Sequence, residues 1–147
     1  MYLRLSGSEV AVLQAQSRLP GDEIAGQQAS AFWLSLREQT HPFFNEETIW
    51  RVALPPLVGK MNETIPLVEW GGGQRWFRHV QDVAHVRHNA QQLGGHATLF
   101  RYANPNAIPG DGVFHPFRNN IETITRRLKN ALDPLGTFNP NRLIKNL

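Results

Sequence analysis

The sequence predicts an α+β fold in which helices pack on one face of an antiparallel sheet. Segments with the two-residue apolar alternation of strands are interleaved with segments whose apolar residues recur at helical spacing. Two strand segments are joined by the run Gly71–Gly73, which is typical of a tight antiparallel hairpin. The predicted order is strand, helix, helix, three strands, helix, strand and helix. Its two βαβ-like halves favour a ferredoxin-like arrangement.

The first third of the chain is predicted to hold one strand and two helices. Residues 2–5 alternate between polar and apolar and predict a strand. Ser8 is a good N-cap for a helix over 9–19, which a Pro-Gly pair ends. A second helix is expected over 25–39 because its apolar residues fall on one face, and it ends before Pro42.

The middle of the chain is predicted to hold four strands and one helix. The strands are expected at residues 47–54, 66–70, 74–79 and 96–102. The helix is expected over 81–93, with Gly94 and Gly95 after its end. Its inward-facing residues are predicted to be Val83, Val86, Ala90 and Leu93.

A last helix is predicted over 118–132, after a long loop, and Pro134 lies just past its end. Its apolar residues are expected to face inward and its basic residues outward. The inward set is Ile121, Ile124, Leu128 and Leu132, and the outward set is Arg126, Arg127 and Lys129. Residues 133–147 are too irregular for a fold element, so we expect a domain over 1–132 followed by a tail.

Composition limits the classes of protein to which the chain can belong. Its 147 residues match one domain, and the lack of cysteine excludes disulfides and thiolate metal sites. No signal-peptide pattern follows Met1, and no apolar run approaches the ~18 residues of a membrane span, so we expect a cytoplasmic protein. The 15 basic residues exceed the 12 acidic ones without forming consecutive blocks, which is weak evidence for nucleic-acid binding.

Two motifs suggest ligand chemistry but fit better as structure. The glycine run resembles a phosphate loop, but such a loop needs a helix after it, and residues 74–77 alternate like a strand. His85 and His88 lie three residues apart on a predicted helix, with His79 just before it. No carboxylate completes a metal-ligand set, and no His-Glu-x-x-His pattern occurs. We therefore expect a hairpin turn and no metal site.

Arg51 and Arg75 are the candidate ligand-binding residues. They alternate with Trp50 and Trp76, so the tryptophans and the arginines are expected on opposite faces of the sheet. If helices cover the tryptophan face, the other face presents two guanidinium groups, which suit a carboxylate or a phosphate. Pairing with surface acids is the alternative interpretation. No nucleophile or acid–base pair is apparent, so any redox chemistry would belong to a cofactor.

The end of the chain resembles the C-terminal signature of FAD-linked oxidases of the vanillyl-alcohol oxidase type. Residues 133–141 read DPLGTFNPN, against the family pattern Asp-Pro-x-Gly-x-x-Asn-Pro-Gly. Residues 49–56 (IWRVALPP) and 69–76 (EWGGGQRW) narrow the resemblance to the E subunits of bacterial glycolate oxidase. Asn141 stands where the family has glycine, and Asn tolerates the left-handed backbone better than most residues.

This resemblance implies a cap, or substrate, domain over 1–132 and a tail that returns to an FAD-binding domain lacking from this sequence. In that family the cap sheet covers the isoalloxazine ring, so Arg51 and Arg75 would face the substrate and the flavin. The flavin-domain contacts would be Phe138, Asn139 and Arg142. FAD is the implied cofactor of the full-length protein, and we expect this chain alone to be inactive and not to hold it.

The resemblance also implies a reaction and partners. The family complex oxidises glycolate to glyoxylate, with a flavin-containing D subunit and an iron–sulfur F subunit, and association with the membrane would be peripheral, through the complex. The alternative is a non-catalytic ferredoxin-like interaction domain for subunit assembly, since a fold does not fix a function. Nucleic-acid binding is a third hypothesis, which requires exposed aromatic residues along the open sheet face.

Overall fold

The computed structural model describes residues 1–24, 26–59, 61 and 66–144 of the chain. The chain forms two compact units, Met1–His41 and Pro42–Leu147, and each is described here by itself. The sequence predicts a different division, into a domain over 1–132 and a tail over 133–147, and this division stays a prediction. Residues 145–147 of that tail lie outside the described residues.

The first unit contains two helices, α1 (Glu9–Gln16) and α2 (Gly26–Arg37). α1 starts after Ser8, whose Oγ accepts a hydrogen bond from the amide of Ala11 at 3.4 Å. This bond satisfies one of the amides that the first turn of a helix leaves without a partner, as expected of an N-cap. Both predicted helices are confirmed with shorter ends, and Ala25 lies outside the described residues.

The predicted strand over residues 2–5 is wrong. A strand is held by hydrogen bonds to a neighbouring strand, and the described residues of this unit contain no other strand to supply them. Tyr2 instead packs its ring against Phe32 of α2, with 4.5 Å between the ring centroids. Tyr2 therefore packs on a helix, and residues 2–5 have no strand to pair with among the described residues of this unit.

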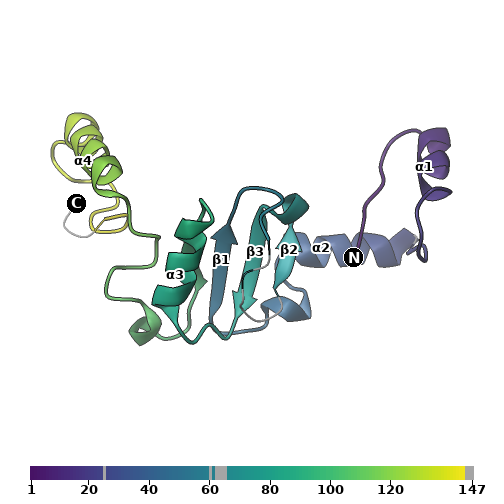
Figure 1. The fold of residues 1–147 in the computed structure, drawn as a ribbon, viewed down its shortest axis with the longest axis horizontal. Helices are drawn as coiled ribbons and strands as arrows, with labels where there is room; N and C mark the ends of the chain where they lie inside the picture. Colours follow the sequence, from purple (N-terminus) through teal and green to yellow (C-terminus); the bar gives the residue numbers. More distant parts are fainter. Residues whose placement is uncertain (25, 60, 62–65, 145–147) are drawn as a thin grey trace. The chain divides into compact units, whose positions relative to one another are not determined.

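The second unit is built on a four-stranded antiparallel sheet, shown in teal and green tones in Figure 1. Its strands are β1 (Ile49–Ala53), β2 (Leu67–Glu69), β3 (Gln74–Arg78) and β4 (His96–Arg101). They lie in the order β2-β3-β1-β4. α3 (Val83–Gln92) connects β3 to β4, so these elements form a split βαβ unit with β1 between its two strands. The predicted α+β class is confirmed.

The glycine run forms the predicted hairpin. β2 and β3 pair antiparallel on either side of it, with Glu69 opposite Gln74. Gly71 has a φ of 61° and Gly72 a φ of 95°, which are left-handed conformations that residues with a Cβ rarely adopt. A strand follows the glycines, so the phosphate-loop interpretation does not apply to this turn.

The core lies on the face of the sheet against which α3 packs, which we call the helix face. Alternate residues of β1, β3 and β4 point to this face, where they meet the inward residues of α3. The buried core consists of Trp50, Val52, Leu54, Met61, Phe77, Val86, Ala90, Ala97 and Leu99. Of the helix residues predicted to face inward, Val86 and Ala90 are fully buried, and Val83 and Leu93 pack at the edge of the core.

The chain turns sharply between α3 and β4, and Gly95 permits this turn. A Cβ at this position would lie 2.0 Å from the carbonyl oxygen of Ala53 and 2.6 Å from a methyl group of Leu54. Only a residue without a side chain allows β1 and the start of β4 to approach this closely.

The opposite face of the sheet carries a cluster of Phe44, Trp76 and Phe100, and we call it the aromatic face. The ring of Trp76 meets Phe44 and Phe100 edge-on, at centroid distances of 5.4 and 4.9 Å. Such edge-to-face pairs stabilise beyond the area that they bury. The indole Nε1–H of Trp76 donates to Glu69 at 2.6 Å, which satisfies the polar group of a buried ring.

α4 (Asn119–Leu132) is confirmed as a helix, but its predicted orientation is wrong. The residues expected to face inward are exposed, for example Ile124 at 60%, Leu128 at 56% and Leu132 at 75%. Of the basic residues expected outward, Arg126 and Lys129 are half-buried because they pair with acidic side chains of the same segment. The apolar spacing identifies a face that favours burial, but spacing cannot tell whether this chain supplies the partner.

The tail begins as an ordered turn around Asp133. Its carboxylate accepts hydrogen bonds from the ammonium of Lys129, from the amide and hydroxyl of Thr137, both at 3.0 Å, and from the amide of Phe138 at 2.9 Å. The Lys129 bond, followed by the Phe138 amide, holds the pKa of Asp133 far below its usual range. Asn141 has a φ of 59°, so asparagine does adopt the left-handed conformation predicted for this position.

We expect Asp133→Asn to loosen this turn at neutral pH. The depressed pKa means that the carboxylate stabilises the turn fully above the usual aspartate value of about 4, and that this stabilisation is lost as the pH falls below it. Amide resonances of Thr137 and Phe138 should therefore stay constant from pH 7 to pH 5 in the wild type. In the variant they should be displaced from their wild-type positions at both pH values. Asp22→Asn, at an exposed carboxylate, is the control. Unchanged resonances in Asp133→Asn would contradict the assignment.

Candidate functional site

The structure places the two predicted arginines on opposite faces of the sheet. In the antiparallel register Arg51 lies opposite Trp76, and Arg75 lies opposite Val52. Directly opposed residues share a face, so Arg51 lies on the aromatic face and Arg75 on the helix face. The expectation that both arginines face away from both tryptophans is wrong, because alternation along each strand does not set the phase between strands.

Arg75 is buried, at 6% exposure, and its donors are engaged within the chain. Its Nη1 and Nη2 donate to the carbonyl oxygens of Gly59 at 2.7 Å and Val58 at 2.6 Å. Its Nε makes a longer bond to the carbonyl of Gly72 at 3.4 Å. These bonds tie the segment after β1 to the hairpin, and they favour a structural role for Arg75 over contact with a ligand.

Arg51 is half-buried on the aromatic face. Its guanidinium lies over the ring of Phe100, 5.9 Å from the centroid. Phe100 is itself 42% exposed, so the two residues form a cationic and aromatic spot at the surface. This is the part of the predicted arginine face that the structure supports.

The predicted tail residues are exposed. Phe138 is 67% exposed, and Asn139 and Arg142 are exposed beside it. Asn139 has a φ of 45°, which gives the tail a second left-handed turn. Their proposed contact with a flavin domain stays a prediction.

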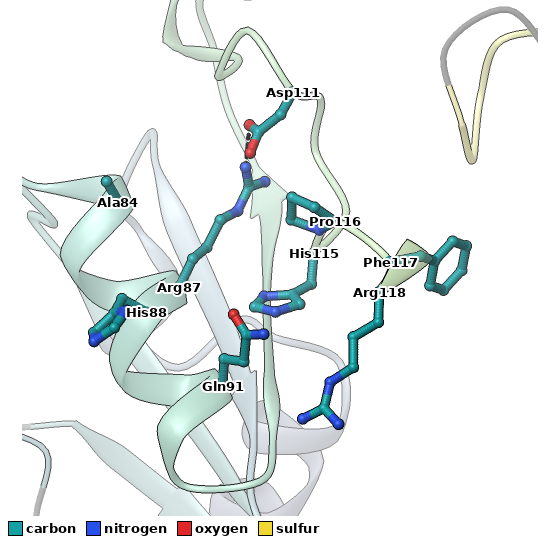
Figure 2. Close-up of a pocket in the computed structure, with 9 residues that line it drawn as sticks. All are labelled: Ala84, Arg87, His88, Gln91, Asp111, His115, Pro116, Phe117 and Arg118. Atoms are coloured by element: carbon teal, nitrogen blue, oxygen red, sulfur yellow. Dashed lines mark hydrogen bonds and ion pairs between the residues drawn. The ribbon is translucent and has the colours of Figure 1, made fainter. Parts of the chain in front are cut away.

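The structure reveals a pocket that the sequence does not predict, between α3 and the segment 111–118 (Figure 2). Its volume is about 310 Å³. α3 contributes one wall and the loop before α4 the other. The lining residues are Ala84, Arg87, His88, Gln91, Asp111, His115, Pro116, Phe117 and Arg118.

Arg87 connects the two walls of the pocket. It is 6% exposed, although it belongs to a helix at the surface of the sheet. Its guanidinium forms an ion pair with Asp111, and Figure 2 shows this side chain reaching from α3 to the loop. It also donates to the carbonyl oxygens of Gly112 at 2.6 Å and Phe114 at 2.9 Å. This arginine therefore holds the loop against the helix.

His115 lies in the pocket as a neutral imidazole. Its Nδ1 accepts a hydrogen bond from the amide of Ala97 at 3.3 Å, which places the ring proton on Nε2. Burial lowers the pKa of His115, and the nearby charges of Arg87 and His96 lower it further, while Asp111 acts in the opposite direction. His115 therefore offers an N–H donor near neutral pH.

The pocket is rich in hydrogen-bond donors. His115 presents Nε2–H, Arg118 brings a guanidinium, and Gln91 brings an amide. The carboxylate that lines the pocket, Asp111, is already paired with Arg87. An arrangement of this kind suits a small carboxylate or another small oxyanion, whose oxygens accept from several donors at once.

One sequence signal could have located this pocket. Arg87 is four residues after Val83 and three before Ala90, so it lies on the inward stripe of α3. An arginine on an apolar helix face is rarely buried without a partner. No local pattern, however, identifies Asp111 as that partner, because their pairing depends on the path of a loop.

Metal ligation and membrane insertion find no support in the described residues. No group of three or more His, Asp or Glu side chains among them is close enough to hold a metal ion. None of the helices in the described part of the chain is long and apolar enough to cross a membrane.

Comparison with known proteins supports one of the families considered from the sequence. Glycolate oxidase subunit GlcE of Escherichia coli (strain K12) is 38% identical over 151 aligned residues, which cover 100% of this chain. The whole chain is similar to GlcE. The resemblance predicted from the strands and the tail is thereby confirmed. The chain spans 39% of the length of GlcE. No protein-family model matches the chain, and no solved structure gives a significant match.

Proposed function

We propose that this chain is the C-terminal part of a glycolate oxidase E subunit and contributes to the oxidation of glycolate to glyoxylate. The observation that carries this proposal is the similarity to GlcE along the entire chain. Glycolate loses two electrons and two protons in this reaction, and FAD, when bound, would take up both as it is reduced to FADH2. The D and F subunits of the complex are the proposed partners.

The pocket beside α3 is the proposed site for the substrate carboxylate. Glycolate is a small hydroxy acid, and its carboxylate needs converging donors to replace its hydration. His115 and Arg118 supply such donors from one loop, and Gln91 supplies another from the facing helix. Arg51 with Phe100 offers a single cation on the other face, so it is the weaker candidate for the carboxylate and the candidate for facing the flavin.

FAD is the proposed cofactor of the full-length protein, and the glycine run of this chain does not form a cradle for its phosphates. The glycines of the chain that resemble a phosphate loop join two strands, so they do not present a helix N-terminus to a pyrophosphate. A cradle for the FAD phosphates would therefore come from other residues of a full-length protein. Phe138, Asn139 and Arg142 remain the proposed contacts of the tail with that region.

A chimaera tests the proposed function. The matching segment of Escherichia coli GlcE is replaced by this chain, and the chimaera is expressed with the D and F subunits in cells that lack GlcE. We expect glycolate-dependent reduction of a dye by membranes or extracts to be restored. Co-purification with the D subunit and bound FAD show that the chimaera is assembled. An assembled, FAD-containing chimaera without glycolate-dependent activity would contradict the proposal.

In the same chimaera we expect Arg118→Ala to raise the KM for glycolate about tenfold or more. A hydrogen bond to a charged group contributes about 1.5–3 kcal/mol, and 1.4 kcal/mol corresponds to tenfold. Arg127→Ala, at an exposed arginine of α4 outside the pocket, is the matched control and should leave KM unchanged. Arg51→Ala should lower turnover or flavin content without this change in KM. The pocket assignment falls if Arg51→Ala raises KM and Arg118→Ala does not.

A further inference from the structure

The organisation of the pocket depends on one buried side chain that does not need to touch a ligand. Arg87 sits in the core side of α3, and its guanidinium lies over the ring of Trp50, 5.4 Å from the centroid. Trp50 is fully buried in an inner strand of the sheet, so the guanidinium packs against a ring that is itself held in place. A planar cation stacked on a buried ring loses little further freedom when it forms hydrogen bonds.

From this position Arg87 binds one loop at three residues. It binds the carboxylate of Asp111 and the carbonyl oxygens of Gly112 and Phe114. The next residue is His115, which lines the pocket. The Nε–H of Arg87 is buried and finds no acceptor among the described residues, so the hydrogen bonds that hold this side chain come from its two terminal nitrogens.

A second contact holds the ring of His115. The amide of Ala97 in β4 donates to Nδ1, so the loop is held by contacts with both α3 and β4. The proton on Nε2 is then available to the pocket. The charged or titratable groups around the ring are Arg87 on α3, His96 on β4 and Asp111 on the loop, and His88 and Arg118 also line the pocket.

We propose that Arg87 is a positioning residue, which fixes the segment 111–115 so that His115 presents Nε2–H as a neutral donor to a small carboxylate in the pocket. The carboxylate part of this inference rests on the proposed function. The positioning part rests on the contacts of Arg87 alone. Arg87 acts through the loop, whereas His115 and Arg118 make the contacts with the ligand.

Two substitutions should move the titration of His115 in opposite directions. Arg87→Met removes the positive charge beside His115, so the pKa of His115 should rise towards that of a free imidazole. It also removes the hydrogen bonds that hold the loop, so the amide of Ala97 should exchange faster. Asp111→Asn leaves the carbonyl bonds and removes the carboxylate that favours the imidazolium, so the pKa should fall. Imidazole resonances followed against pH in the full chain measure both.

Arg87→Lys and the matched surface variant Arg127→Met complete the test. Lysine keeps the positive charge but lacks the paired donors of the guanidinium. Arg87→Lys should therefore change the pKa of His115 less than Arg87→Met does, while still speeding exchange of the Ala97 amide. Arg127→Met should change neither. If Arg87→Met does not fold, the results for Asp111→Asn and Arg87→Lys decide whether Arg87 is a positioning residue. A pKa that rises in Asp111→Asn, or an Ala97 amide unaffected in Arg87→Lys, overturns the proposal.

Kinetics in the chimaera separate this inference from the proposed function. There Arg87→Lys should raise the KM for glycolate on the order of tenfold with a smaller change in kcat, since the donor is displaced and not removed. Altered His115 titration with an unchanged KM would keep Arg87 as a positioning residue and exclude the pocket as the glycolate site. Unaltered titration and amide exchange would exclude the positioning role whatever the kinetics show.

Discussion

Arg75→Met should lower the free energy of unfolding of the sheet-containing unit by about 3 kcal/mol. The guanidinium is buried and satisfies the carbonyl oxygens of Val58 and Gly59. Methionine fills a similar volume but donates nothing, so both acceptors are left without this partner, at about 1–3 kcal/mol each. Urea unfolding followed by tryptophan fluorescence measures the effect, since Trp50 and Trp76 are buried in this unit.

Arg51→Met is the matched control for this prediction. Arg51 is half-buried, and its described contact is with the ring of Phe100, which is worth about 0.5–1 kcal/mol at an exposed site. Its loss should therefore change the free energy of unfolding by less than about 1 kcal/mol. Equal effects of the two variants would show that Arg75 is not the structural arginine that its hydrogen bonds indicate.

Gly95→Ala should destabilise the same unit by about 3 kcal/mol, through steric overlap and not through a lost bond. The added Cβ would lie 2.0 Å from the carbonyl oxygen of Ala53, which belongs to the central strand. A backbone atom cannot move aside as the end of a side chain can, so β1 and β4 must separate where they are paired. Thermal unfolding should show a clear loss of Tm in this variant.

Gly110→Ala provides the comparison. A Cβ at this position meets nothing within 4 Å, and its backbone does not require glycine by its φ. The substitution also reduces the freedom of the unfolded chain, so it should be neutral or slightly stabilising, by up to about 1 kcal/mol. A Tm for Gly95→Ala equal to that of Gly110→Ala would contradict the close approach of β1 and β4.

The sheet and α3 could be predicted from the sequence because their signals are local. Trp50 and Val52 alternate with Arg51 along β1, and the glycines after Glu69 mark the hairpin. These patterns agree with the fold because β1 and β3 bury side chains on both faces of the sheet. The strand expected at residues 2–5 failed for a physical reason: alternation describes one segment, and a strand exists only with a neighbour.

The faces of the two predicted arginines could not be derived in the same way. Arg75 and Trp76 alternate, but only the pairing of Val52 with Arg75 decides which of them joins the core. The predicted burial of the apolar face of α4 is wrong for a similar reason, since helical spacing identifies an apolar face but not the surface that covers it.

The pocket was harder to predict from the sequence than any helix or strand. Arg87 and Asp111 are separated by α3, β4 and a loop, and their ion pair forms only when these have folded. Resemblance to a family led to the proposed function, but the donors of His115 and Arg118 are assembled by tertiary structure. Sequence patterns report which residues are unusual, and only the fold reports which of them meet.

The position of β1 in the sheet has a consequence for how the chain folds. β1 is the first strand along the chain, yet it lies between β3 and β4, which both follow it in sequence. Its hydrogen bonds therefore close long loops, which makes for high contact order and slow folding. During synthesis this apolar strand leaves the ribosome before either neighbour, so it depends on the prompt arrival of β3 and β4 to avoid pairing with other chains.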